Sequence, residues 1–119
     1  MMKFMRHGYE VTLNQIHDII TIREGDERLK LTVNGEPMRM VAGLNKAQKK
    51  MKELNDNATD EQIIDCANFF ASVIFGQEQA KKLMEFYADD PACVITICGR
   101  YFKERLAGKI AKAQKKMKA

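Results

Sequence analysis

The sequence is poor in the residues that build catalytic and metal sites. Tryptophan is absent, and histidine and proline each occur only twice among the 119 residues. His7 and His17 have no cysteine at the short spacings typical of zinc ligands, and the chain contains no HExxH motif. We therefore expect neither a metal site nor a bound cofactor.

The cysteines are few and irregularly spaced. Cys66, Cys93 and Cys98 form an odd set without CxxC spacing, which excludes a disulfide framework and a zinc ribbon. Reduced thiols that pack as small hydrophobic side chains are expected. Cys93 follows a predicted helix start, where a helix dipole can lower a thiol pKa. Because no histidine lies near it in the sequence, we favour a packing role for Cys93 as well.

Nucleophilic and phosphate-binding motifs are also missing. Ser72 is the single serine, and it lies inside an apolar run rather than in a GxSxG turn. Gly76 follows that run without the neighbouring glycines of a phosphate-binding loop. We therefore expect that the chain is not an enzyme.

Long apolar runs are absent. None approaches the ~18 residues needed to span a bilayer, and the start, MMKFMRHGYE, lacks the apolar stretch of a secretory signal. We expect an intracellular protein that does not enter a membrane.

Alternating side chains predict a small sheet near the start of the chain. Apolar and polar residues alternate over 28–33, the pattern of a half-buried strand. Shorter runs at 19–23 and 37–41 flank it, separated by turn residues at 24–26 and by Asn34-Gly35. The sequence thus predicts an antiparallel β-meander of about three strands.

After the meander, apolar residues no longer recur at every second position but at the spacing of a helix. Leu44, Ala47, Met51 and Leu54 form a narrow stripe on a lysine-rich helix. A second predicted helix, which begins after Thr59, is apolar nearly all round and should be central. Two further helices follow, and the last one leads into a polar, lysine-rich tail.

Helix boundaries carry recognisable signals. Thr59 and Gln62 have the spacing of a capping box, in which each side chain bonds to the other residue's backbone N–H. Gly76 is placed to end the apolar helix in a left-handed conformation. Asp90 and Pro91 fit an N-cap followed by proline at the first helical position.

These patterns indicate an α+β fold with one domain. Residues 1–15 are a poorly defined N-terminal segment, and residues 16–119 form the single domain. Within that domain we expect the β-meander at 16–41, a helical core at 42–107 and a basic C-terminal tail at 108–119.

Two sets of residues are candidates for binding a partner. The stripe of Leu44, Ala47, Met51 and Leu54 either faces a partner or packs in the core against the next helix. The second set is basic, because residues 92–119 carry eight Lys or Arg side chains and one Glu. These cations can neutralise phosphates, dock on an acidic protein or simply be solvated, and aromatic residues for base stacking are not interleaved among them. The candidates in this set are Arg105, Lys109, Lys112 and Lys116.

Three segments give the chain a resemblance to a known family. They are TVNGEPMRM at 32–40, the TDEQ-capped apolar helix, and IFGQEQAKKL at 74–83, which leads to a basic final helix. Their order resembles that of the small tail assembly chaperones of long-tailed bacteriophages and prophages of Gram-positive hosts. The likeness covers roughly residues 28–119.

The resemblance implies a function and partners. Such chaperones are made in the host bacterial cytoplasm, are absent from the mature virion and have no catalytic residues. They hold the tape measure protein soluble and recruit the major tail protein, which forms the tail tube. A homo-oligomer is compatible with this function, because several copies can shield one long helical client. The alternative function is a small nucleic-acid-binding regulator that uses the basic C-terminal helix, although nucleic acid is the less favoured partner.

Overall fold

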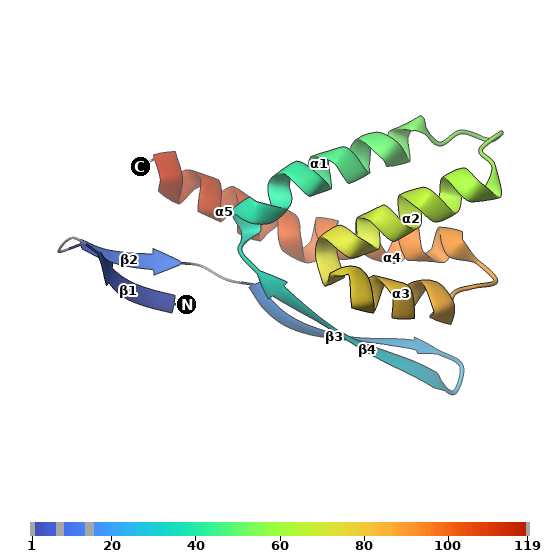
Figure 1. The fold of residues 1–119 in the computed structure, drawn as a ribbon, viewed down its shortest axis with the longest axis horizontal. Coiled ribbons are helices and arrows are strands. Elements are labelled where there is room, and N and C mark those ends of the chain that lie inside the picture. The colour runs from blue at the N-terminus through green and yellow to red at the C-terminus, as the bar shows by residue number, and fades with distance from the viewer. Residues whose placement is uncertain (1, 7–8, 14–15, 119) are drawn as a thin grey trace.

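The computed structural model describes residues 2–6, 9–13 and 16–118, which form two antiparallel hairpins and a set of helices (Figure 1). The elements in chain order are β1 (Met2–Arg6), β2 (Tyr9–Leu13), β3 (Ile16–Glu24), β4 (Glu27–Gly35), α1 (Pro37–Glu53), α2 (Asp60–Phe75), α3 (Gln77–Phe86), α4 (Pro91–Tyr101), η1 (Phe102–Leu106) and α5 (Ala107–Lys118). The backbone stays helical at both ends of the π-helical turn η1. Therefore α4, η1 and α5 form one long helix, here called the C-terminal helix, and the predicted α+β class is confirmed.

The first hairpin pairs β1 with β2, with Met2 opposite Leu13 and Arg6 opposite Tyr9. It lies in the N-terminal segment for which the sequence predicted no defined structure. Residues 1, 7–8, 14–15 and 119 are outside the described part of the chain.

The second hairpin pairs β3 with β4 over nine residues each, from Ile16 opposite Gly35 to Glu24 opposite Glu27. Burial alternates along both strands, as the period of two predicts. Ile16, Leu31 and Val33 face the helices and are at most 1% exposed. The turn contains Gly25 at a φ of 59°, a conformation that glycine adopts without steric cost.

The third predicted strand, Pro37–Val41, is wrong. These residues form the first turn of α1, with Glu36 as N-cap and Pro37 at the first helical position. Proline fits there because its missing N–H has no helical partner in any case. The alternation of Met38 and Met40 spans too few residues to distinguish a strand from a helix. Correspondingly, α1 begins at Pro37, before the predicted start of the helical core at residue 42.

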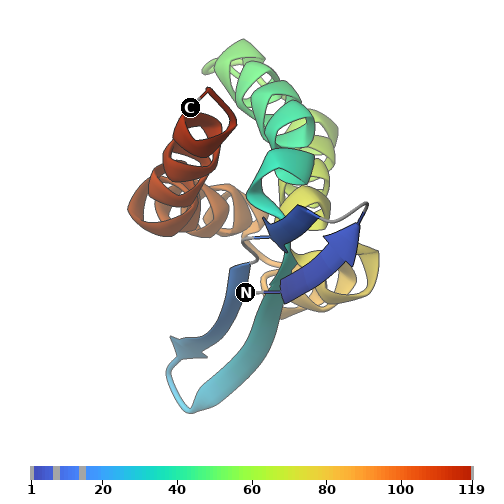
Figure 2. The same ribbon diagram turned by 90° about the vertical axis from the view of Figure 1, so that its left-hand side faces the viewer.

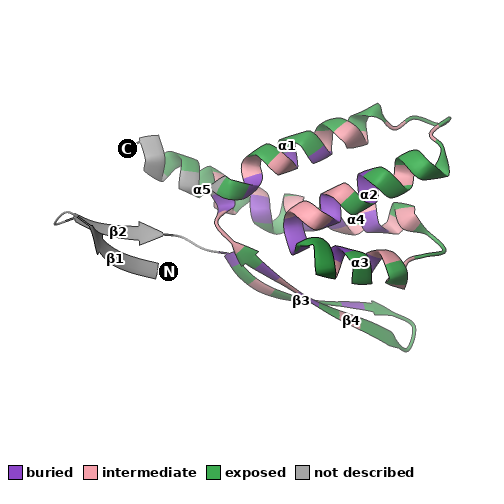
Figure 3. Ribbon diagram, viewed as in Figure 1, coloured by how far each residue is buried: buried purple, intermediate pink, exposed green. Residues whose placement is uncertain are grey.

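Helix α2 is the centre of the helical layer. It contacts α1, α3, α4 and β4, which agrees with its nearly all-apolar sequence. Figure 3 shows buried residues gathered on the facing sides of the helices and exposed residues on their outer sides. The fully buried core includes Leu31, Leu44, Phe70, Leu83 and Leu106.

Different helices contact the two strands of the β3–β4 hairpin. Helices α2 and α3 contact β4, whereas the C-terminal helix reaches β3 through Asp18, which hydrogen-bonds to Tyr101 and Arg105. Figure 2 shows this arrangement, with the C-terminal helix on the β3 side and α3 on the β4 side.

Gly76 separates α2 from α3 and has a φ of 86° and a ψ of 161°. The positive φ agrees with the predicted helix stop, but the ψ value differs from that of a left-handed helical residue. This extended region is populated almost only by glycine. Gly76 therefore turns the chain sharply from α2 into α3.

Candidate functional site

Helices α1 and α2 meet in a tight seam. Gly43 of α1 lies against Val73 of α2, where a Cβ on residue 43 would come within 2.9 Å of a Val73 methyl carbon. Further along, the Lys46 and Lys50 ammonium groups lie 5.7 and 5.4 Å from the centre of the Phe69 ring. Both distances are within the range of cation–π attraction. We call the surface formed by these five residues the α1–α2 seam.

Phe69 and Val73 are apolar side chains that the fold leaves half-buried. Beside Val73 the surface is hollowed by a pocket of about 490 Å³, where α1 meets the end of β4. The pocket is lined by Asn34, Glu36, Arg39, Met40, Gly43 and Val73. Together, the seam and this pocket offer apolar contact area with charged groups at its border.

The stripe predicted on α1 divides between core and surface. Leu44 is 1% exposed and Ala47 is fully buried, which corrects their assignment as partner-facing residues. They belong to the core cluster of the fold, because α1 packs against α2 and α5. Met51 and Leu54 are half-buried. Leu54 lines a small hollow of about 110 Å³ between α1 and α2.

Two of the predicted basic residues, Arg105 and Lys109, lie beside the carboxylate of Asp18 on β3. Arg105 Nη2 lies 3.1 Å from Asp18 Oδ1, and Lys109 Nζ lies 3.9 Å from the same oxygen. The Tyr101 hydroxyl donates to Asp18 Oδ2 at 2.6 Å. Because the Asp18 side chain is only 11% exposed, this network fixes the C-terminal helix to the hairpin.

These contacts shift the pKa values of Asp18 and Tyr101. The hydrogen bond from Arg105, and then that from Tyr101, lowers the pKa of Asp18. Burial and the bond to Asp18 raise the pKa of Tyr101. Asp18 is therefore charged and Tyr101 protonated at neutral pH. Two candidate cations thus have a structural partner, whereas Lys112 is exposed, and the side chain of Lys116 is outside the described part of the structure.

Gln79 is a structural residue whose role no pattern in the sequence predicted. Its Oε1 accepts the Thr32 N–H at 2.8 Å, and its Nε2 donates to the Thr32 carbonyl at 2.6 Å. The same Nε2 lies 2.8 Å from the Phe75 carbonyl, at the end of α2. The only signal in the sequence is the place of Gln79 in IFGQEQA, in the first turn of α3.

The predicted caps are placed at helix starts. Thr59 Oγ1 accepts from Gln62 N at 3.2 Å, and Gln62 Oε1 accepts from Thr59 N at 2.9 Å, which completes a capping box. Pro91 is at the first position of α4, after the N-cap Asp90. The Asp90 carboxylate makes no backbone cap, but accepts from Cys93 Sγ at 3.1 Å.

This hydrogen bond to the Asp90 carboxylate raises the pKa of the Cys93 thiol. Burial raises the pKa of Cys98 to about 12 and also raises that of Cys66. All three cysteines are free, and each of these shifts favours the protonated thiol over the thiolate.

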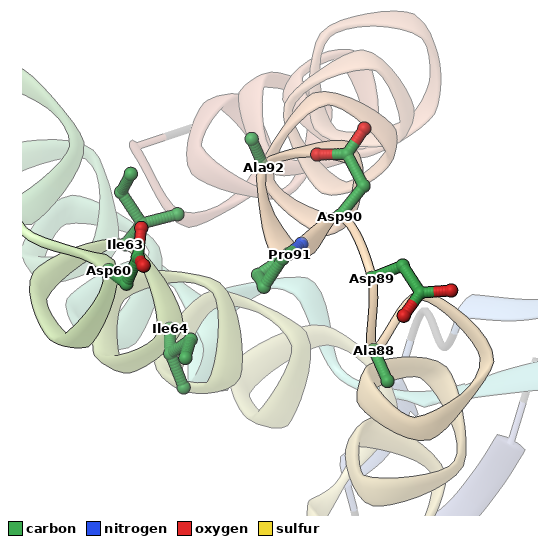
Figure 4. A pocket seen from close by; sticks show the side chains of 8 residues that line it. All are labelled: Asp60, Ile63, Ile64, Ala88, Asp89, Asp90, Pro91 and Ala92. Atoms are coloured by element: carbon green, nitrogen blue, oxygen red, sulfur yellow. The ribbon is translucent and has the colours of Figure 1, made fainter.

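A second hollow lies between the start of α2 and the α3–α4 loop (Figure 4). Its volume is about 330 Å³. Three carboxylates border it, those of Asp60, Asp89 and Asp90. The rest of its lining is apolar and consists of Ile63, Ile64, Ala88, Pro91 and Ala92. Ile64 is 43% exposed.

Within the described residues, no group of three or more His, Cys, Asp or Glu side chains is arranged to hold a metal ion. No helix in the same part of the chain is long and apolar enough to cross a membrane. Comparison of the chain with protein-family models, curated proteins and solved structures finds no match.

Proposed function

We propose that the chain is a non-enzymatic assembly chaperone of the phage tail type. In this proposal it acts in the host bacterial cytoplasm, binds the tape measure protein and brings major tail protein subunits to it. The proposal starts from the resemblance carried by TVNGEPMRM, the TDEQ cap and IFGQEQAKKL.

The observation that carries the proposal is the half-buried pair Phe69 and Val73 in the α1–α2 seam. A tape measure protein is long and helical, so its apolar helix faces need cover before assembly. Half-buried apolar side chains beside a pocket form a surface on which an amphipathic helix can pack. Lys46 at the border of the seam favours a client helix with an acidic flank, whereas Lys50 is already paired with Asp65 at 3.2 Å.

Co-expression with a fragment of the tape measure protein tests the proposal. The fragment alone should aggregate, and it should become soluble and co-purify when this chain is present. Phe69→Gln should reduce the recovered fragment by roughly tenfold, because it removes a central apolar contact. Circular dichroism melting shows whether the variant remains folded.

Ile64→Gln is the matched control, since Ile64 is an exposed apolar residue on α2 that is outside the seam. This variant should recover as much fragment as the parent chain. Equal losses for both variants would assign the effect to general hydrophobicity. A folded parent chain that binds neither the tape measure fragment nor the major tail protein would refute the proposal.

The second candidate is a nucleic-acid-binding regulator, and the exposed Lys112 and Lys115 on α5 favour it. Its binding to DNA or RNA should weaken steeply with salt. Reversal of both charges, to Glu, should then abolish binding. Lack of binding at low salt would exclude it.

A further inference from the structure

The two edges of the β3–β4 hairpin differ, and the contact of Gln79 with Thr32 shows how. Because both peptide groups of Thr32 bond to Gln79, they point away from β3. In an antiparallel pair, residues that face each other alternate between bonding to the partner strand and pointing outward. Ile19 is opposite Thr32, so the Ile19 N–H and C=O also point outward, and those of Thr21 follow the same alternation.

Helix α3 thus satisfies the outer edge of β4 at Thr32, whereas no described residue bonds to the outer edge of β3. In the described part of the chain, β3 pairs with β4 alone. Among the backbone bonds outside regular elements in the described residues, none involves Ile16–Glu24. The sequence IHDIITIRE has no proline or lysine to block pairing. Ile19, at the middle of this edge, is 58% exposed.

The charges beside the open edge indicate what kind of strand fits. The C-terminal helix is on the β3 side of the hairpin (Figure 2), and an added strand would lie about 4.8 Å beyond β3. Arg105 and Lys109 share the single carboxylate of Asp18, and their side chains remain 55% and 36% exposed. This surplus of positive charge favours carboxylates on the helix-facing side of the added strand.

We propose that the open edge of β3 is a docking site for an extended acidic segment of a partner protein, which adds to the hairpin as a third strand. Main-chain hydrogen bonds to Ile19 and Thr21 supply affinity, as in other cases of strand addition. Arg105 and Lys109 supply the preference for acidic side chains. This inference is independent of the proposed chaperone function, because it rests on the hairpin edge and not on the α1–α2 seam.

The probe is a nine-residue peptide, the length of β3, in which Glu alternates with Thr. A peptide that alternates Lys with Thr is its matched control. Titration into the full chain, followed by amide chemical shifts, should move the signals of Ile19 and Thr21. The Glu-bearing peptide should bind at least ~10-fold more tightly than the Lys-bearing one at low salt.

Two variants separate the main-chain contribution from the electrostatic one. Thr21→Pro removes an outward N–H and keeps the β3–β4 ladder, since proline is tolerated where an edge N–H faces solvent. It should abolish binding. Lys109→Glu should weaken binding of the Glu-bearing peptide by roughly tenfold. Lys82→Glu, an exposed site on α3, should change affinity little.

Three results would overturn the proposal. One is failure of the Glu-bearing peptide to bind the parent chain at low salt. Another is equal binding to the parent and to a folded Lys109→Glu variant. The last is a dimer in sedimentation that Thr21→Pro dissolves, because a second copy of the chain would then be the occupant of this edge.

Discussion

The side-chain amide of Gln79 hydrogen-bonds to both peptide groups of Thr32, although 47 residues separate the two positions. The Gln79 amide thereby makes the two hydrogen bonds that a residue of a neighbouring strand would make to Thr32. The same nitrogen reaches the Phe75 carbonyl, so a single residue joins the end of α2, the start of α3 and the edge of β4. Gln79 therefore joins the β3–β4 hairpin to the helices at this point.

Gln79→Leu should destabilise the protein by about 1–3 kcal/mol, because it leaves half-buried peptide groups without their partner. Urea unfolding monitored by circular dichroism measures the change in the free energy of unfolding. Gln79→Glu should also destabilise, since a carboxylate accepts from Thr32 N–H but repels the Thr32 and Phe75 carbonyls. A Leu variant as stable as the parent would show that solvent satisfies this edge equally well.

Asp18→Asn should make stability less dependent on pH. The hydrogen bond from Arg105 lowers the pKa of Asp18 below its ordinary value of 3.8. A carboxyl group with a lowered pKa in the folded state stabilises the protein above the unfolded-state pKa. That contribution is lost as the pH falls through the folded-state pKa.

At pH 7, Asp18→Asn should therefore be less stable than the parent by about 1–3 kcal/mol. The difference should shrink as the pH falls below about 4. Urea unfolding at a series of pH values compares the two proteins. A difference that is constant from neutral to acid pH would show that Asp18 is not stabilised as a carboxylate.

Local features of the fold were predictable from the sequence, and long-range contacts were not. The alternation at 28–33 and the spacing of Thr59 and Gln62 act over a few residues, so their patterns predict a strand and a helix cap. Residues 37–41 were assigned wrongly because proline fits both a strand end and a helix start.

In the candidate site, too, the residue types were predictable from the sequence, whereas their long-range contacts were not. Arg105 stood out as a cation, but its contact with Asp18 joins residues 87 positions apart, and no local pattern indicates it. Leu44 and Ala47 formed a clear stripe, yet the stripe alone does not show whether a partner or the protein's own core covers it. Tertiary packing decided this question.

Gly76→Ala should destabilise the protein by about 1–3 kcal/mol, because φ at this position is 86° and a side chain there strains the backbone. Apart from the adjoining residues, no atom lies within 4 Å of the added Cβ, so overlap with the rest of the fold does not contribute. Gly99→Ala is the control, since Gly99 has similar free space and helical geometry. It should stabilise by up to ~1 kcal/mol. Thermal melts compare the two variants. A lower melting temperature for Gly76→Ala and a higher one for Gly99→Ala would show that backbone strain at residue 76, and not the loss of a glycine in general, is destabilising.

Asp90→Asn should increase the reactivity of Cys93 towards an aromatic disulfide reagent near pH 8. The Asp90 carboxylate raises the pKa of Cys93, and its removal should therefore increase the thiolate fraction. Cys66 and Cys98 are buried and should react only on unfolding. Peptide mapping of the labelled protein identifies the site. Unchanged labelling of Cys93 would show that the carboxylate does not control this thiol.

Gly43→Ala should open the α1–α2 seam, because the new methyl group would lie 2.9 and 3.0 Å from the two Val73 methyl carbons. Overlap of this kind costs about 1–3 kcal/mol, which exceeds the ~1 kcal/mol that alanine gains over glycine in a helix. In a Val73→Ala background the overlap disappears, and the same substitution should become neutral or stabilising. A double-mutant cycle of urea unfolding isolates this coupling. Gly108→Ala, which meets no atom within 4 Å, should show no coupling to Val73→Ala, and equal coupling at both glycines would disprove close packing at the seam.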